Sequence, residues 1–140
     1  MAGNRKLEAL AAVELFAGCS KRELGAIARL CARVVVDDGF VLTTEGGPGH
    51  ECFVIAAGDA DVTIGGRSVA HVGPGACVGE MSLLDGGERT ATVTAMTLMV
   101  IYVIGAREFQ SLLEVSPSIS HKIMISLARR LRDAETDRPH

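Results

Sequence analysis

This sequence of 140 residues is poor in aromatic side chains: it contains no tryptophan, one tyrosine and four phenylalanines. Few rings are therefore available to cap a flat ligand by stacking, and we expect the one tyrosine, Tyr102, to belong to the core. An excess of positive charge is also missing, since the net charge is −3 at pH 7. This balance argues against non-specific binding to nucleic acid, and no polybasic segment suggests a membrane surface.

Long hydrophobic runs are absent as well. The most apolar stretch, LMVIYVI at 98–104, is far too short to span a bilayer. The N-terminus, MAGNRKLEALAAVELF, is amphipathic and carries acidic residues, unlike a secretory signal peptide. We therefore expect a cytoplasmic protein without a membrane partner.

The four cysteines, Cys19, Cys31, Cys52 and Cys77, match no zinc or redox spacing. Each lies in an apolar neighbourhood, so we interpret them as reduced core residues of a cytosolic protein. A disulfide in a secreted domain is the alternative, and the lack of a signal peptide disfavours it.

Catalytic and metal-binding motifs are missing too. A metal-dependent cupin would need a His-x-His pair, and the histidines stand singly at 50, 71, 121 and 140. No nucleophile–base set, GxGxxG motif or P-loop is present. We predict no catalytic residue, no metal and no cofactor, and keep a cupin-like enzyme as an alternative.

The chain divides into three zones, which we predict to form a single domain over 1–140. The first, 5–32, has helical periodicity, with Ser20 and Glu23 as a capping box. The second, 33–104, consists of short β-rich runs separated by Asp-Gly, Gly-Gly and Gly-Pro turns. The third, 105–134, is helical again, with Pro117 near the start of its second helix. The pattern predicts a mainly β, jelly-roll-like barrel of six to eight strands flanked by helices.

One stretch, GEMSLLDGGERTATV at 79–93, combines an acid and a base around a glycine-rich bend. Gly79 allows a ligand to approach the backbone, and EMSLL can form one helical turn whose free amides face an anion. Asp85-Gly86-Gly87 would end that turn, and Arg89 would begin a strand. These residues would make a cradle in which Arg89 binds a monoanionic phosphate and Glu80 accepts sugar hydroxyls. The alternative is an internal Glu80–Arg89 salt bridge beside a β-turn.

This stretch resembles the phosphate-binding cassette of the cyclic-nucleotide-binding domain family. The family pattern is Gly-Glu-apolar-small-Leu, a short turn, then Arg-(Thr/Ser/Ala)-Ala-x-Val; here the matching residues are Gly79, Glu80, Met81, Ser82, Leu83, Arg89, Thr90, Ala91 and Val93. The resemblance covers about 7–132, and it implies an eight-stranded β-roll with N-terminal helices and two C-terminal lid helices.

The resemblance also implies roles for individual residues. Arg89 would hold the cyclic phosphate, and Glu80 would accept from the ribose 2′-hydroxyl. Backbone amides near Gly79, Met81 and Ala91 would complete the cradle, and Thr90 would lie near the phosphate and the purine edge. The expected ligand-binding set is Val78, Gly79, Glu80, Met81, Ser82, Arg89, Thr90, Ala91 and Arg130.

The trailing helix would be the lid over the base. Candidates for base contact are Met124, Leu127, Arg130, Leu131 and Ala134. The cluster Arg129, Arg130 and Arg132 suggests a solvated helix end, although Arg130 could reach the ligand. The segment ARRLRDAETD lacks the Thr-Ser pair with which the bacterial catabolite activator contacts adenine, so adenine selectivity is not secured.

The resulting hypothesis is a cytoplasmic, bacterial sensor domain that binds cAMP, or less readily cGMP, and shifts its lid helices on binding. Two alternatives stay open: an orphan domain used only for protein association, and a cGMP-selective binder. A homodimer through the C-terminal helix or a downstream effector is the expected partner. DNA is not expected, because the sequence ends before any helix-turn-helix module.

Overall fold

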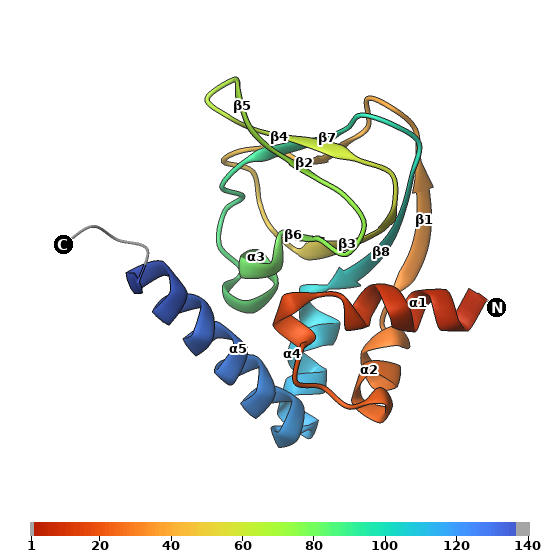
Figure 1. Ribbon diagram of the computed structural model, residues 1–140, viewed down its shortest axis with the longest axis vertical. Helices are drawn as coiled ribbons and strands as arrows, with labels where there is room; N and C mark the ends of the chain where they lie inside the picture. The colour runs from red at the N-terminus through yellow and green to blue at the C-terminus, as the bar shows by residue number, and fades with distance from the viewer. Residues whose placement is uncertain (1, 137–140) are drawn as a thin grey trace.

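The computed structural model describes residues 2–136 (Figure 1). Three helical segments come first, followed by eight strands with one helix inserted among them, and two helices end the chain. The helices are α1 (Ala2–Ala11), η1 (Glu14–Phe16), α2 (Lys21–Ala28), α3 (Glu80–Asp85), α4 (Ala106–Val115) and α5 (Pro117–Thr136). The strands are β1 (Ala32–Val36), β2 (Val41–Thr43), β3 (Glu51–Ala57), β4 (Ala60–Ile64), β5 (Arg67–Val72), β6 (Cys77–Val78), β7 (Thr92–Ala95) and β8 (Met99–Gly105).

The strands form two four-stranded antiparallel sheets, in the orders β1-β8-β3-β6 and β2-β7-β4-β5. We call them the first and the second sheet. They face each other to make a β-roll, and the helices lie against the outer face of the first sheet (Figure 1). The prediction of an eight-stranded β-roll with N-terminal and C-terminal helices is confirmed.

Two hydrophobic cores follow from the alternation of side chains along β3. Phe53 and Ile55 point into the roll, where they pack with buried residues of both sheets such as Val93 and Met99. Cys52 and Val54 point the other way, into a core shared with η1, α2, α4 and α5. Tyr102 belongs to this second core, as predicted.

Local signals set several helix boundaries where the sequence placed them. The Ser20 hydroxyl accepts from the Glu23 amide, and the Glu23 carboxylate accepts from the Ser20 amide, so the predicted capping box begins α2. α5 begins at Pro117 and continues to Thr136, which places Arg129, Arg130 and Arg132 before its last turn. Within residues 2–136, no helix is long and apolar enough to cross a membrane.

One predicted boundary is wrong: β7 begins at Thr92, three residues after Arg89. Arg89 pairs instead with the turn that follows β2, since its amide donates to the Gly47 carbonyl and its carbonyl accepts from the Gly46 amide. The register between β2 and β7 also shifts between Val41 and Thr43. The ladder is therefore interrupted where the chain leaves the cassette, and Arg89 lies in an irregular segment.

Candidate functional site

The site is built on the connection between β6 and β7. After β6, Gly79 takes a left-handed backbone conformation (φ 81°) and acts as the N-cap of α3. The helix ends at Asp85, and its C-cap, Gly86, is also left-handed (φ 69°). A Cβ atom on Gly79 would collide with Nη1 of Arg89 and lie 3.2 Å from the Glu51 carbonyl oxygen. Gly79 is therefore required twice, for its dihedral angle and for the close approach of Arg89.

Arg89 is the most informative residue of the site because it is a buried cation. Only 8% of its surface is exposed, and its guanidinium lies 5.7 Å from the centre of the Phe53 ring. Its Nη1 atom is buried and has no hydrogen-bond partner among the described residues. Burial lowers the pKa of Arg89 from its ordinary value, and the nearby Glu51 carboxylate opposes that shift. A buried donor without a partner costs free energy, and an acceptor from outside the described residues would remove that cost.

Arg89 and α3 border a cavity of about 420 Å³, within the usual size range of small-molecule pockets. Eight of the residues expected to bind ligand line it: Val78, Gly79, Glu80, Met81, Ser82, Arg89, Thr90 and Ala91. The sequence reading missed seven further lining residues, Thr43, Val62, Val72, Cys77, Asp85, Val93 and Glu88. Three of these, Thr43, Val62 and Val72, come from β2, β4 and β5, so only the pairing of the second sheet could have revealed them.

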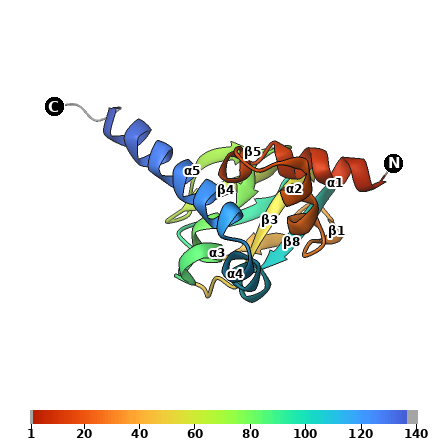
Figure 2. The ribbon, with the colours of Figure 1, turned by 90° about the horizontal axis from the view of Figure 1, so that it is seen from below.

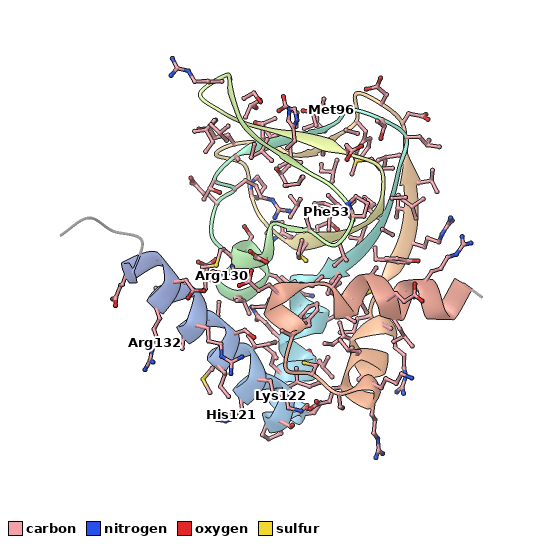
Figure 3. The ribbon with its side chains drawn as sticks, viewed as in Figure 1. Phe53, Met96, His121, Lys122, Arg130 and Arg132 are labelled. Carbon is pink, nitrogen blue, oxygen red and sulfur yellow. The ribbon has the colours of Figure 1, made fainter. Side chains whose placement is uncertain are left out.

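Glu80 is held from the lid side of the cavity. Its Oε1 atom accepts from Nη1 of Arg130 at 2.7 Å, and the side chains of Glu80 and Arg130 are 22% and 34% exposed. Figure 3 shows Arg130 where α5 passes α3. The internal Glu80–Arg89 salt bridge considered above is therefore not formed, because Glu80 pairs with α5 and Arg89 Nη1 has no partner in the described part of the chain.

None of the base-contact candidates on α5, Arg130 included, is among the described residues that line this cavity. Met124 and Leu131 are 61% and 67% exposed. Figure 2 shows the C-terminal half of α5 projecting past the rest of the molecule. Arg130 meets the cassette through its bond to Glu80.

The other end of α5 is attached to α2. The Glu23 carboxylate accepts from Lys122 and from the Ser118 hydroxyl, both on α5. These contacts and the Ser20 bonds of the capping box lower the pKa of Glu23 from 4.5 to about 2. The hydrogen bond from Lys122 makes the largest contribution. The predicted apolar residues Ile119 and Ile123 are buried beside this attachment, and Leu112, Leu113 and Leu127 pack against the same core. The N-terminal part of α5 is thus anchored to α2, while Arg130, nearer to its C-terminal end, forms an ion pair with Glu80 of α3.

A larger cavity, of about 820 Å³, lies between α1 and the first sheet. The two arginines that line it, Arg5 and Arg33, are exposed, so neither is a buried cation like Arg89. We therefore place the site at the smaller cavity, where the unpaired guanidinium lies. Nowhere in residues 2–136 do three or more His, Cys, Asp or Glu side chains gather as potential metal ligands.

Comparisons with known proteins show the family of this chain. The family model described as "Cyclic nucleotide-binding domain" matches residues 33–116, which include the β-roll and α3. The chain is 30% identical over 128 residues to the cyclic AMP receptor protein of Thermus thermophilus, covering 88% of this chain and 59% of that protein. It is 34% identical over 116 residues to a cyclic nucleotide-gated potassium channel of Mesorhizobium japonicum, covering 83% of this chain and 32% of the channel.

A solved structure is similar over almost its entire length. The N-terminal domain of a transcriptional regulator from Streptomyces coelicolor superposes with a TM-score of 0.83 at 31% identity, covering 94% of this chain and 98% of that one. Both of these curated relatives are longer: this chain spans 32% of the length of the channel and 59% of the length of the receptor.

Proposed function

Because this chain belongs to the cyclic nucleotide-binding domain family, we propose that it is a regulatory domain that binds cAMP and catalyses no reaction. One observation carries the proposal: Arg89 lines a cavity together with Gly79 and α3, and its buried Nη1 atom has no hydrogen-bond partner among the described residues. A cation in that position can be neutralised by one bound anion without moving the protein's own charges.

The phosphate of the ligand would bind at the Arg89 end of the cavity. A guanidinium matches two oxygens of a phosphate as a fork, and a partly desolvated site strengthens that bond. The first amides of α3 and the amide of Ala91 would supply further donors. Asp85 and Glu88 also line the cavity and carry negative charge. A cyclic phosphate has one negative charge, so it would be repelled less by these carboxylates than a dianionic 5′-monophosphate.

The ribose would bind at Glu80, whose carboxylate can accept from the 2′-hydroxyl. Arg130 already occupies one oxygen of this carboxylate, and no donor within residues 2–136 bonds to the second oxygen. A carboxylate accepts through both of its oxygens, so Glu80 can keep Arg130 and take a ribose hydroxyl at the same time. Arg130 would then become part of the bound-state contact between α5 and the ligand.

The base would lie against the apolar wall formed by Val62 and Val72, with Thr90 at the exposed rim. A threonine hydroxyl can donate and accept, so it does not by itself distinguish adenine from guanine. The relatives named as cAMP-responsive favour cAMP. A cGMP-selective domain is the alternative that the experiment below separates.

The proposed output is a shift in the position of α5. The base of this helix is anchored to α2 through Glu23, whereas Arg130 couples its far half to the cassette. Ligand binding at Glu80 would change the strength of that coupling and thus the population of lid positions. A micromolar ligand has about 8 kcal/mol of binding free energy, and only its difference between the two lid positions can drive the shift.

The exposed residues of α5 support a partner for that output. Met124 and Leu131 lie seven positions apart on the helix and are largely exposed. Side chains at this spacing share one helix face. A second copy of the chain or an effector domain would cover them, and an orphan domain used only for association would use the same face.

A thermal-shift comparison tests the ligand. We expect cAMP to raise the melting temperature as its concentration exceeds Kd, cGMP to act more weakly and 5′-AMP to have no effect at the same concentration. A shift only with cGMP would reverse the assigned selectivity. The absence of a shift with either cyclic nucleotide, confirmed by calorimetry on the folded protein, would leave the orphan alternative.

A further inference from the structure

Two thiols at the base of the cassette meet in a way that the proposed function does not use. The Sγ atoms of Cys52 on β3 and Cys77 on β6 lie 2.8 Å apart. A disulfide bond is about 2.05 Å long, so the sulfurs need to approach by less than about 1 Å. We propose that Cys52 and Cys77 are a reversible disulfide site, and that closing the bond weakens ligand binding.

Strand register explains why these two side chains meet. Val54 pairs with Cys77 and Phe53 with Val78, so Cys52 lies diagonally across from Cys77 on the same face of the first sheet. Diagonal neighbours usually have Cα atoms about 7–8 Å apart. Disulfides span about 4.4–6.8 Å between Cα atoms, so closure draws β6 along β3.

That movement would act directly on the cassette. β6 ends at Val78, and Gly79, the N-cap of α3, is the next residue. Gly79 lies within contact distance of both Arg89 and the Glu51 carbonyl, which precedes Cys52. A shift of β6 therefore displaces Gly79, against which the Arg89 guanidinium packs. This second half of the proposal rests on the function proposed above, whereas formation of the bond does not.

The ligand cavity provides the route for an oxidant. Cys77 lines the cavity and is partly exposed, whereas Cys52 is fully buried behind it. The Cys77 thiolate attacks a peroxide, giving a sulfenic acid and releasing hydroxide, which takes up the proton from the thiol. The Cys52 thiol then attacks the Cys77 sulfur, and the sulfenic oxygen leaves as water. The balance is two thiols and hydrogen peroxide giving one disulfide and two waters.

The environment of Cys77 determines the relative rates of these two steps. The hydrogen bond with Cys52 and burial raise the pKa of Cys77 well above its ordinary value, which keeps the thiol protonated and the first step slow. The second step is intramolecular between sulfurs that already touch, so it follows faster than a second peroxide can react. A nucleotide in the cavity would cover Cys77 and slow the first step.

The test uses the full chain with Cys19 and Cys31 replaced by serine, so that only the pair remains. After hydrogen peroxide treatment, we expect the intact mass to fall by two hydrogen atoms. Digestion without reductant should yield one peptide pair linked through Cys52 and Cys77, and dithiothreitol should restore both thiols. Cys77→Ala and Cys52→Ala in this background are the matched controls, and neither should lose two hydrogens intramolecularly. Bound cAMP should slow the reaction, and the oxidised protein should bind cAMP at least about fivefold more weakly.

The outcomes separate the two halves. Oxygen addition or cross-linking between molecules, without the linked peptide, would overturn the disulfide site. A disulfide that leaves the cAMP affinity unchanged would overturn its effect on binding. If the reduced chain binds no cyclic nucleotide while the linked peptide still forms, the proposed function fails and the disulfide site stands.

Discussion

The two ends of the cavity differ in the burial and the pairing of their charged side chains. At one end, the guanidinium of Arg89 is buried and its Nη1 has no partner in the described chain. At the other end, the carboxylate of Glu80 is partly exposed and already paired with Arg130. Among the described residues, the more accessible Glu80 therefore has an ion-pair partner, whereas Nη1 of the buried Arg89 has no hydrogen-bond partner.

This difference indicates which end would contribute most to binding. An unpaired buried donor has already lost its water, so an incoming phosphate oxygen gains the contact without a further desolvation cost on the protein side. Glu80 is more solvated and keeps a protein partner, so a ribose hydroxyl adds less there. We therefore expect the Arg89 end to dominate affinity and the Glu80 end to adjust selectivity and the lid.

Removing the guanidinium tests the dominant end. We expect Arg89→Ala to weaken cAMP binding by about 2 kcal/mol or more, roughly 30-fold, which is the scale of a lost buried charge-assisted contact. Arg89→Lys keeps the charge but loses the forked geometry of the guanidinium. Its affinity for cAMP should lie between those of Arg89→Ala and the wild type. Calorimetry gives the affinity and chemical denaturation checks the fold. An unchanged affinity in a folded Arg89→Ala protein would refute the phosphate role.

The close approach at Gly79 gives a second, smaller effect. Gly79→Ala and Gly86→Ala both place a Cβ on a left-handed residue, so each should lower the free energy of unfolding by about 1 kcal/mol. Gly86 has open space around it, whereas a Cβ on Gly79 would displace Arg89. Only Gly79→Ala should therefore also weaken cAMP binding, by about tenfold. Equal affinities in the two variants would show that Arg89 does not depend on this contact.

At the ribose end, the expected change is smaller and selective. Glu80→Gln should weaken cAMP by about 1 kcal/mol and its 2′-deoxy analogue by less, because the analogue lacks the hydroxyl that the carboxylate accepts from. Arg130→Gln, measured beside it, shows how much of the loss comes from releasing the lid contact. Equal losses for the two nucleotides in Glu80→Gln would rule out the ribose role.

The smallest effect concerns the attachment of α5 to α2 through Glu23. The folded pKa of Glu23, about 2, lies below its ordinary 4.5, so its contribution to stability is present above 4.5 and is lost as the pH falls toward 2. Glu23→Gln should therefore flatten the acid dependence of the free energy of unfolding in this window, and Lys122→Met should flatten it in part. Urea unfolding at several pH values measures both. If Lys122→Met showed the same acid dependence as the wild type, the Lys122 contact would contribute nothing to the pH dependence of stability.

Local sequence signals predicted the parts of the molecule that depend on neighbouring residues. The capping box of α2, the start of α5 at Pro117 and the short helix between Gly79 and Gly86 each follow from a few adjacent side chains and backbone angles. The set of cassette residues around the cavity was predictable for the same reason, since their spacing is contained in one loop and helix. The start of β7 was not, because the backbone of Arg89 pairs with the distant turn at Gly46 and Gly47.

By itself, then, the sequence determined the order of elements, the cassette and its two main charged residues, Glu80 and Arg89. All of these arise from local propensity and spacing. The tertiary structure alone decided that Nη1 of Arg89 is buried without a hydrogen-bond partner in residues 2–136, and that Glu80 is held by Arg130, fifty positions away. It also decided that the wall of the cavity comes from β2, β4 and β5. These features depend on strand pairing and helix packing between distant segments, and such contacts are established only when the whole chain folds.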